Sequence, residues 1–304
     1  MVSDYRGAPL PYDSRNETFG GPGLRVVAII AAYNERRFIG PCLEHLAQHG
    51  VEGYLIDNCS TDETVELAEP WLDRNLIGIE SFPRGEGGVY DWGGLLRRKE
   101  ELARELEADW FIHLDPDEVR LPPSTRQTVA QALEEVDREG FSAVDFAEFT
   151  FIPTREQPDH DHPDFRRTLR TYYPFAPRPL HQLKAWKANG SVEIAGSGGH
   201  RANFPGLRVY PRQFPMKHYL FLSIPHAIEK YVERHYSQDE VKSGWHGWRA
   251  TLTAEDIRLP SESELHAIRA DGGLDTSRSR KAHYMEDITR RASRLEDAVG
   301  HSRT

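Results

Sequence analysis

Residues 26–32 read Val-Val-Ala-Ile-Ile-Ala-Ala, and Tyr33, Asn34 and Glu35 follow at once. Seven apolar residues without polar alternation are typical of a strand that is covered by protein on both of its faces. In open α/β sheets, ligands bind beyond the carboxyl ends of the strands. The stretch therefore predicts a buried parallel strand whose end, from Ala31 to Glu35, belongs to a binding site.

Three more apolar segments follow this strand, and helical patterns separate them. Strands and helices that alternate four times with short connections predict an α/β fold with a doubly wound, mostly parallel sheet and right-handed crossovers. Ser60 to Glu63 also reads as a capping box that opens the second helix. We expect strands at residues 25–30, 53–57, 76–81 and 110–114, and helices at 38–49, from 60 onward and at 95–107.

The pattern changes beyond residue 140, where short strands with little helix between them predict a smaller antiparallel portion. We expect these strands at residues 141–152, 184–187, 191–195, 208–211 and 217–222. Three parts of the chain follow from this reading: a flexible N-terminal arm (1–23), one α/β domain (24–222) and a helical C-terminal extension (223–304).

Composition excludes several classes of partner. The 304 residues contain 38 Lys and Arg against 48 Asp and Glu, a formal net charge of −10, and no long basic run, so we expect no nucleic-acid partner. The longest apolar run has seven residues. A membrane-spanning helix needs about 20, so we expect no membrane span. Two cysteines and an N-terminus without a secretory pattern favour the cytoplasm.

Asp115 and Asp117 directly follow the apolar residues 110–114. Two carboxylates at this spacing, at the end of a buried strand, can direct oxygen atoms at one divalent ion, and Mg²⁺ favours one or two carboxylates plus substrate phosphates. Asp159 and Asp161 have the same spacing, but no strand precedes them, and they read as a polar loop. We therefore predict that Asp115 and Asp117 form the functional pair.

Asp57 ends the second predicted strand. Its carboxylate can accept a hydrogen bond from a nucleobase N–H or a ribose hydroxyl, and the ring of Tyr33 offers a face for stacking. Either residue alone would be consistent with an ordinary turn between a strand and a helix. Together with Asp115 and Asp117, they favour a nucleotide site.

The motifs at residues 26–35, 54–64 (Tyr-Leu-Ile-Asp-Asn-Cys-Ser-Thr-Asp-Glu-Thr) and 113–118 (His-Leu-Asp-Pro-Asp-Glu) together resemble the family 2 glycosyltransferases of the GT-A fold. The resemblance covers about residues 24–222. It implies a nucleotide-diphosphate-sugar donor, with UDP and GDP as the nucleotides to test, and Mn²⁺ or Mg²⁺ as the cofactor. It also implies a donor site that includes Ala31, Tyr33, Glu35, Asp57 and Asp115, and a metal held by Asp117 and His218.

Three departures from the family pattern stand out. Ala31-Ala32 replaces the usual Pro-Thr before Tyr-Asn-Glu, and Asn58 replaces the frequent second acidic residue after Asp57. A Gln-x-x-Arg-Trp motif does not occur in the sequence. This last departure, in a chain without an expected membrane span, indicates a non-processive enzyme rather than a polysaccharide synthase.

The sequence leaves the general base open. Glu193 stands just before Gly196–Gly199, which is either a flexible acceptor loop or a turn, and we take it as the first candidate. His200, Asp145 and Glu148 are the others. The resemblance implies inversion at the anomeric carbon.

These observations favour a metal-dependent, non-processive glycosyltransferase that moves a sugar to a hydroxyl of a glycan or a small molecule. A nucleotidyltransferase that acts on sugar phosphates is one alternative, but it should carry a glycine-rich basic loop after the first strand, and residues 31–37 contain no glycine. A non-catalytic nucleotide-sugar binding protein is the other alternative.

Overall fold

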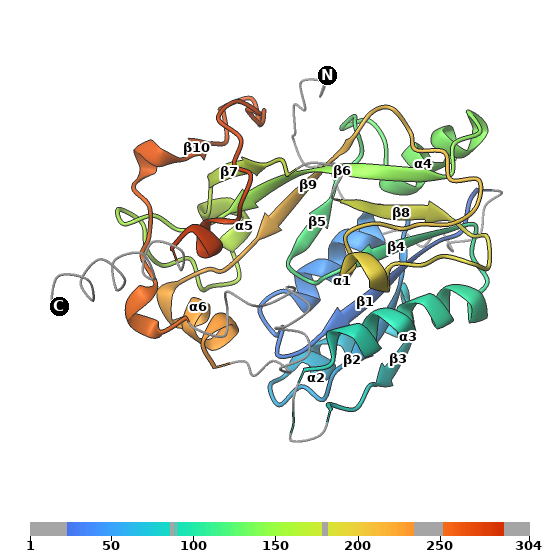
Figure 1. Cartoon of the computed structure of the whole chain (residues 1–304), viewed down its shortest axis with the longest axis horizontal. Coiled ribbons are helices and arrows are strands. Elements are labelled where there is room, and N and C mark those ends of the chain that lie inside the picture. The colour runs from blue at the N-terminus through green and yellow to red at the C-terminus, as the bar shows by residue number, and fades with distance from the viewer. Residues whose placement is uncertain (1–22, 86–87, 89, 178–181, 234–251, 289–304) are drawn as a thin grey trace, which may run out of the picture.

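The computed structural model describes residues 23–85, 88, 90–177, 182–233 and 252–288. Its strands are β1 Val26–Ala32, β2 Glu52–Asp57, β3 Leu76–Ser81, β4 Trp110–Leu114, β5 Glu118–Arg120, β6 Ala143–Phe151, β7 Thr171–Phe175, β8 Leu183–Lys187, β9 Phe214–Tyr219 and β10 His266–Ala267. They form one sheet in the order β10-β7-β6-β8-β4-β1-β2-β3, and β9 pairs with both β6 and β5 (Figure 1).

Six α-helices and four 3₁₀ turns lie wholly within the described part of the chain, and a further helical stretch begins at residue 284. The helices are α1 Ile39–Gln48, α2 Thr64–Ala68, α3 Trp92–Glu105, α4 Val129–Arg138, α5 Phe165–Thr168 and α6 Ile224–Tyr231. The 3₁₀ turns are η1 Glu69–Trp71, η3 Ala195–Ser197, η5 Ala254–Asp256 and η6 Glu262–Glu264.

The first half of the sheet is parallel and covered on both faces. β1 pairs in parallel with β2 and β4, and β2 pairs in parallel with β3. Alternate residues of β1 enter two different cores, because successive side chains of a strand point to opposite faces. Ala28 and Ile30 pack with α1 and α4, whereas Val27 and Ile29 pack with α3. The predicted doubly wound sheet is therefore confirmed.

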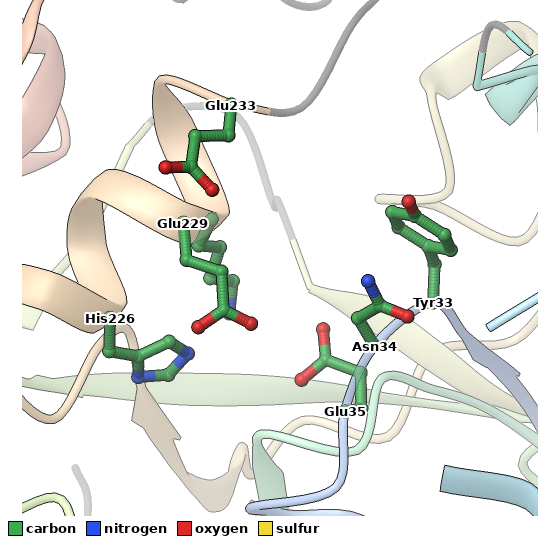
Figure 2. A pocket seen from close by; sticks show the side chains of 7 residues that line it. Tyr33, Asn34, Glu35, His226, Glu229 and Glu233 are labelled. Atoms are coloured by element: carbon green, nitrogen blue, oxygen red, sulfur yellow. The ribbon is translucent and has the colours of Figure 1, made fainter. Parts of the chain in front are cut away.

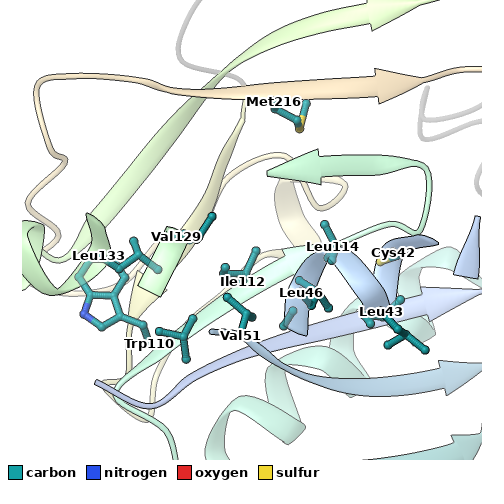
Figure 3. Close-up of a cluster of buried hydrophobic side chains, with 14 of the residues drawn as sticks. Cys42, Leu43, Leu46, Val51, Trp110, Ile112, Leu114, Val129, Leu133 and Met216 are labelled. Carbon is teal, nitrogen blue, oxygen red and sulfur yellow. The ribbon is translucent and has the colours of Figure 1, made fainter. Parts of the chain in front are cut away.

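Figure 3 shows the core on the α1 side of the sheet. Leu43 and Leu46 of α1 gather with Val129 and Leu133 of α4 around Ile112 of β4. All five side chains are almost completely excluded from solvent. Each such burial stabilises the fold by about 1.5–3 kcal/mol. This buried core therefore holds in place the strand ends at which the polar motifs lie.

The second half of the sheet is mainly antiparallel, as expected. β4 pairs with β8, β8 with β6, β6 with β7 and β7 with β10, all antiparallel. β5 pairs antiparallel with β9, and this register sets Glu118 opposite His218. The strands predicted at 191–195 and 208–211 form only isolated bridges, at Glu193–Asn203 and Ala143–Val209.

The capping box predicted at the start of α2 is wrong. Glu63 is the N-cap and its side chain caps no backbone N–H, while Thr64 N–H donates to Oδ1 of Asp62 at 3.0 Å. The hydroxyl of Ser60 instead accepts a hydrogen bond from the backbone N–H of Asn34 at 3.0 Å. The polar residues after β2 thus hold the turn after β1, which the local sequence pattern could not show.

The described part of the C-terminal extension differs from the predicted helical one. α6 is helical, but residues 252–288 contain η5, η6, β10 and a helical stretch that begins only at residue 284. The reason is that Leu252, Ile257, Leu259 and Leu265 pack with β7 and α6 into a separate core rather than forming a helical stripe. The arm at 1–22 and residues 234–251 and 289–304 lie outside the described residues. Among the helices that the structure describes, none combines the length and apolar character needed to cross a bilayer.

Candidate active site

A cleft of about 480 Å³ opens at the carboxyl ends of β1 and β4. Its walls are formed by the strand ends, the start of α3, the end of β7, the β8–β9 region, and α6 with the C-terminal segment. The predicted residues that line it are Ala31, Tyr33, Glu35, Asp115, Asp117, His200 and His218. The topology therefore brings most of the predicted site residues to one place.

His218 lies between two carboxylates in this cleft. Its Nδ1 is 2.7 Å from Oε1 of Glu148 on β6, and its Nε2 is 3.4 Å from Oδ2 of Asp117. Burial by itself lowers the pKa of His218, but Asp117 and Glu148 outweigh it and raise this pKa to about 10. In the metal-free protein His218 is thus an imidazolium at neutral pH.

Asp117 is held by two cationic groups. Besides His218, the Nζ of Lys230 donates a hydrogen bond to Oδ2 of Asp117 at 2.5 Å. Burial raises the pKa of the Asp117 carboxyl, but Lys230 and His218 outweigh burial and keep the pKa well below its ordinary value. Asp117 is therefore a permanently ionised ligand at the end of β4.

Asp117 and His218 fit a divalent ion that takes its other ligands from a substrate. Two neighbouring ligands of an octahedral ion, each at about 2.1 Å, lie about 3 Å apart, close to the 3.4 Å between these side chains. Glu148 accepts from Nδ1 and so leaves Nε2 as the ligand atom when His218 is neutral. In the described ranges, no set of three or more His, Cys, Asp or Glu side chains could hold a metal. Phosphate oxygens and water would have to complete the shell.

Asp115 lines the cleft but is less enclosed than Asp117, with 31% of its side chain exposed. The Nζ of Lys99 lies 3.9 Å from its Oδ1. Lys99 is fully buried, donates to the carbonyl of Leu114 at 3.0 Å, and its burial lowers its pKa to about 8. Lys99 therefore stabilises the end of β4 through its hydrogen bond to Leu114, and its positive charge offsets the negative charge of Asp115.

The predicted base-binding residues lie at the ends of β1 and β2. The guanidinium of Arg84 lies over the Tyr33 ring, 4.1 Å from its centre. Asp57 pairs with Ala32 in the parallel register and is buried. Its Oδ2 accepts from Ser60 N–H at 3.0 Å, and its Oδ1 has no hydrogen-bond partner among the described residues. Asp57 does not line the cleft itself but presents an unused acceptor beside it.

Glu35 also borders a second, smaller cavity of about 170 Å³ next to the cleft. Figure 2 shows the carboxylates of Glu35 and Glu229 facing this cavity from the β1 end and from α6. Asn34 bends the chain here with a positive φ of 55°, and its side chain accepts from Thr61 N–H at 2.8 Å. Lys230 borders both cavities and so connects them.

The structure does not bring Glu193 into the cleft. Glu193 is exposed, and its Oε1 accepts the backbone N–H of Gly196, so that it caps the η3 turn. Gly196–Gly199 is consequently a closed turn in this structure. Asp145 is also engaged elsewhere, because it accepts from the backbone N–H of Gln182 and from the side chain of Gln213. Of the four candidate bases, His200 is the one whose side chain lines the cleft.

The alternative Asp159–Asp161 pair has a structural role. The Nε of Arg37 donates to both carboxylate oxygens of Asp161, at 2.8 and 2.9 Å. Asp159 accepts the backbone N–H of Asp161 at 2.9 Å. The polar-loop interpretation of this pair is therefore correct.

Several cleft residues were not predicted from the sequence. Glu118 is almost fully buried and pairs with Lys184 at 2.7 Å and with Arg120 at 2.5 Å. The signal that could have pointed to Glu118 is its position directly after Asp117. Lys230 had no such signal, because it reaches Asp117 from a helix 113 residues later in the chain.

The family model described as "Glycosyl transferase family 2" matches residues 27–179. A search of curated proteins gave no significant match. Among solved structures, S. aureus TarS 1–349 is similar at 15% identity and a TM-score of 0.37, over 66% of this chain and 61% of that chain.

The TarS structure in complex with UDP has 16% identity and a TM-score of 0.38, over 65% of this chain and 61% of that one. Glucosyl-3-phosphoglycerate synthase from Mycobacterium tuberculosis, in complex with Mn²⁺, UDP and glucosyl-3-phosphoglycerate, has 19% identity and a TM-score of 0.28. That match covers 46% of this chain and 50% of that one. The chain thus spans about three fifths of the TarS fragment.

The family match spans half of the chain and contains the ends of β1, β2 and β4, where Tyr33, Asp57 and Asp117 lie. The chain therefore belongs to glycosyl transferase family 2.

Proposed function

We propose that the protein is a glycosyltransferase that moves a sugar from a nucleotide-diphosphate donor to a hydroxyl acceptor with the help of a divalent ion. The observation that carries the proposal is the Asp117–His218 pair at the end of β4, in the same cleft as Tyr33 and beside Asp57. Family membership gives the reaction class, and this pair supports the metal-dependent form of it.

The ends of β1 and β2 would bind the nucleoside. The free Oδ1 of Asp57 is a buried acceptor that a base N–H would satisfy, and leaving it unpaired costs about 1–3 kcal/mol. Tyr33 would stack on the base. Asp115, which is partly exposed at the end of β4, would accept from the ribose hydroxyls.

Asp117 and His218 would hold Mn²⁺ or Mg²⁺. The bound ion would supply Lewis-acid stabilisation of the charge on the leaving diphosphate. Glu148 keeps the His218 ring oriented through its 2.7 Å contact with Nδ1. Glu118 would not bind the metal, because Lys184 and Arg120 form ion pairs with its carboxylate and neutralise its charge.

His200 would act as the general base. It would take the proton from the acceptor hydroxyl while that oxygen bonds to the anomeric carbon and the bond to the diphosphate oxygen breaks. Attack from the face opposite the diphosphate inverts the anomeric centre. Among the candidate bases that the sequence offered, His200 lines the cleft, whereas Glu148 accepts a hydrogen bond from His218.

The C-terminal segment would complete the acceptor side of the cleft. His283 stacks on Phe175 at 3.8 Å between ring centres and lies 6.1 Å from the His218 ring. The part of the chain around residues 281–286 would therefore contribute to the site. The cytoplasmic location and the non-processive action stay predictions from the sequence.

The test is release of the nucleoside diphosphate from a panel of UDP- and GDP-sugars with Mn²⁺, with water and with a panel of sugar and small-molecule acceptors. We expect release with at least one donor, and its loss in Asp117→Asn but not in Asp161→Asn. A wild-type protein that binds a nucleotide sugar and never releases the diphosphate would be the non-catalytic binding protein instead.

A further inference from the structure

Lys230 approaches the proposed metal ligand Asp117 from α6. Its Nζ donates to Oδ2 of Asp117 at 2.5 Å, and 11% of the Lys230 side chain is exposed. The ammonium also lies 5.6 Å from the centre of the Phe38 ring. Among the described residues, Asp117 is the hydrogen-bond acceptor of Lys230. An ammonium therefore occupies the carboxylate oxygen that faces His218.

The other lysines of the cleft have partners outside the proposed metal site. Lys184 pairs with Glu118 at 2.7 Å, and Lys281 donates to the backbone carbonyl of Ala176. A divalent ion that binds Asp117 would leave both of these contacts intact. It would displace Lys230, because the ammonium and the ion need the same carboxylate oxygen.

Charge decides where the displaced ammonium goes. A divalent ion beside Lys230 places three positive charges next to the single negative charge of Asp117, which is unfavourable because both side chains are largely buried. A nucleoside diphosphate brings the missing negative charge, and lysine binds phosphate readily as a point charge on a flexible stem. Lys230 borders both the cleft and the adjoining cavity, so that its head has space to leave Asp117.

We propose that Lys230 is the counter-ion of Asp117 in the free protein and transfers to the donor diphosphate when metal and nucleotide bind. The inference rests on the proposed function and adds to it the residue that receives the phosphate. It makes Lys230 oppose the binding of the metal alone and favour the binding of metal with a nucleoside diphosphate. The two effects have opposite signs, which a merely structural role would not produce.

Calorimetry on Lys230→Met tests this. Three titrations are compared with the wild type: Mn²⁺ alone, UDP with Mn²⁺, and UMP with Mn²⁺. We expect Mn²⁺ alone to bind the variant roughly tenfold more tightly, because the ion no longer has to displace an ammonium from Asp117. We expect UDP with Mn²⁺ to bind at least roughly tenfold less tightly, because a charge-assisted hydrogen bond to the diphosphate is lost. UMP lacks the second phosphate, so its affinity should fall much less than that of UDP.

Two further variants control the experiment. Lys230→Gln keeps a polar head without the charge and should reproduce the opposite shifts if Lys230→Met fails to fold. Lys187→Met removes an exposed lysine that pairs with Asp137 at 2.7 Å away from the cleft, and should change none of the three affinities.

Shifts of Mn²⁺ and UDP affinity in the same direction, or equal losses for UDP and UMP, would overturn the role of Lys230 and leave the proposed function standing. A wild-type protein that binds neither UDP nor GDP with Mn²⁺ would overturn the proposed function, and the role of Lys230 with it.

Discussion

The Nδ1 atom of His218 lies 2.7 Å from Oε1 of Glu148, and the two residues belong to the paired strands β9 and β6. Glu148 is buried and also accepts hydrogen bonds from Thr150 and Gln182. Its carboxylate therefore has a fixed position and orients the imidazole toward Asp117. This is the arrangement by which carboxylates in proteins orient histidines that bind metals.

Glu148→Gln should weaken the binding of UDP with Mn²⁺ by about 10- to 100-fold, because the amide no longer holds the His218 ring as a charged acceptor does. Asp145→Asn is the matched control, since Asp145 is a buried carboxylate on the same strand that does not contact His218. Calorimetry with UDP compares the two variants. Equal losses in both would remove Glu148 from the orientation of His218.

His200→Gln should preserve the affinity for the donor and slow transfer by roughly 10²-fold or more, because general-base catalysis contributes about 10²–10⁴-fold. Glu193→Gln should transfer sugar at the wild-type rate, since Glu193 caps a turn outside the cleft. Initial rates at saturating donor measure both variants. The reverse result would return the role of base to Glu193.

Lys184→Met should lower the free energy of unfolding by about 3–5 kcal/mol, the usual effect of removing one partner of a buried ion pair. The partner, Glu118, has 2% of its side chain exposed and would keep Arg120 as its one remaining cationic partner among the described residues. The double variant Lys184→Met/Glu118→Gln should recover part of the loss. Urea unfolding compares the wild type, Lys184→Met and the double variant, and a double variant less stable than Lys184→Met would contradict the pairing.

His45 should make the fold sensitive to mild acid. Burial holds its pKa well below the ordinary value of 6.5, and its Nε2 donates to the carbonyl of Arg120 at 2.7 Å. Below pH 6.5 the unfolded chain binds a proton that the folded protein does not, so stability falls as the pH falls. His45→Gln should make the free energy of unfolding in urea less dependent on pH between pH 7 and pH 5, and an unchanged dependence would show that His45 does not cause it.

The parallel half of the fold could be predicted because its signals are local. The uninterrupted apolar residues of β1 indicate burial on both faces, and Asp115 and Asp117 directly follow the buried β4. His218 could be reached through the family resemblance, and the β5–β9 register explains why it meets the end of β4.

The remaining site residues depend on contacts that no local pattern encodes. Glu193 is a candidate base by its sequence position, and the sequence could not show that its carboxylate accepts the backbone N–H of Gly196. Glu148 could be assigned a carboxylate role but not its partner, which comes from a strand 70 residues later. Lys230 depends on how α6 packs at the mouth of the cleft.

Metal-dependent binding of the donor nucleotide is tested most directly by the affinity of the wild-type protein for UDP and for GDP, measured by calorimetry with Mn²⁺ and with a chelator. Because Asp117 and His218 supply only two ligands, metal and nucleotide should bind cooperatively. We expect at least one of the nucleotides to bind roughly tenfold or more tightly with Mn²⁺, and this gain to be lost in Asp117→Asn but kept in Asp161→Asn. Equal affinities with and without metal in the wild type would contradict a metal-dependent donor site.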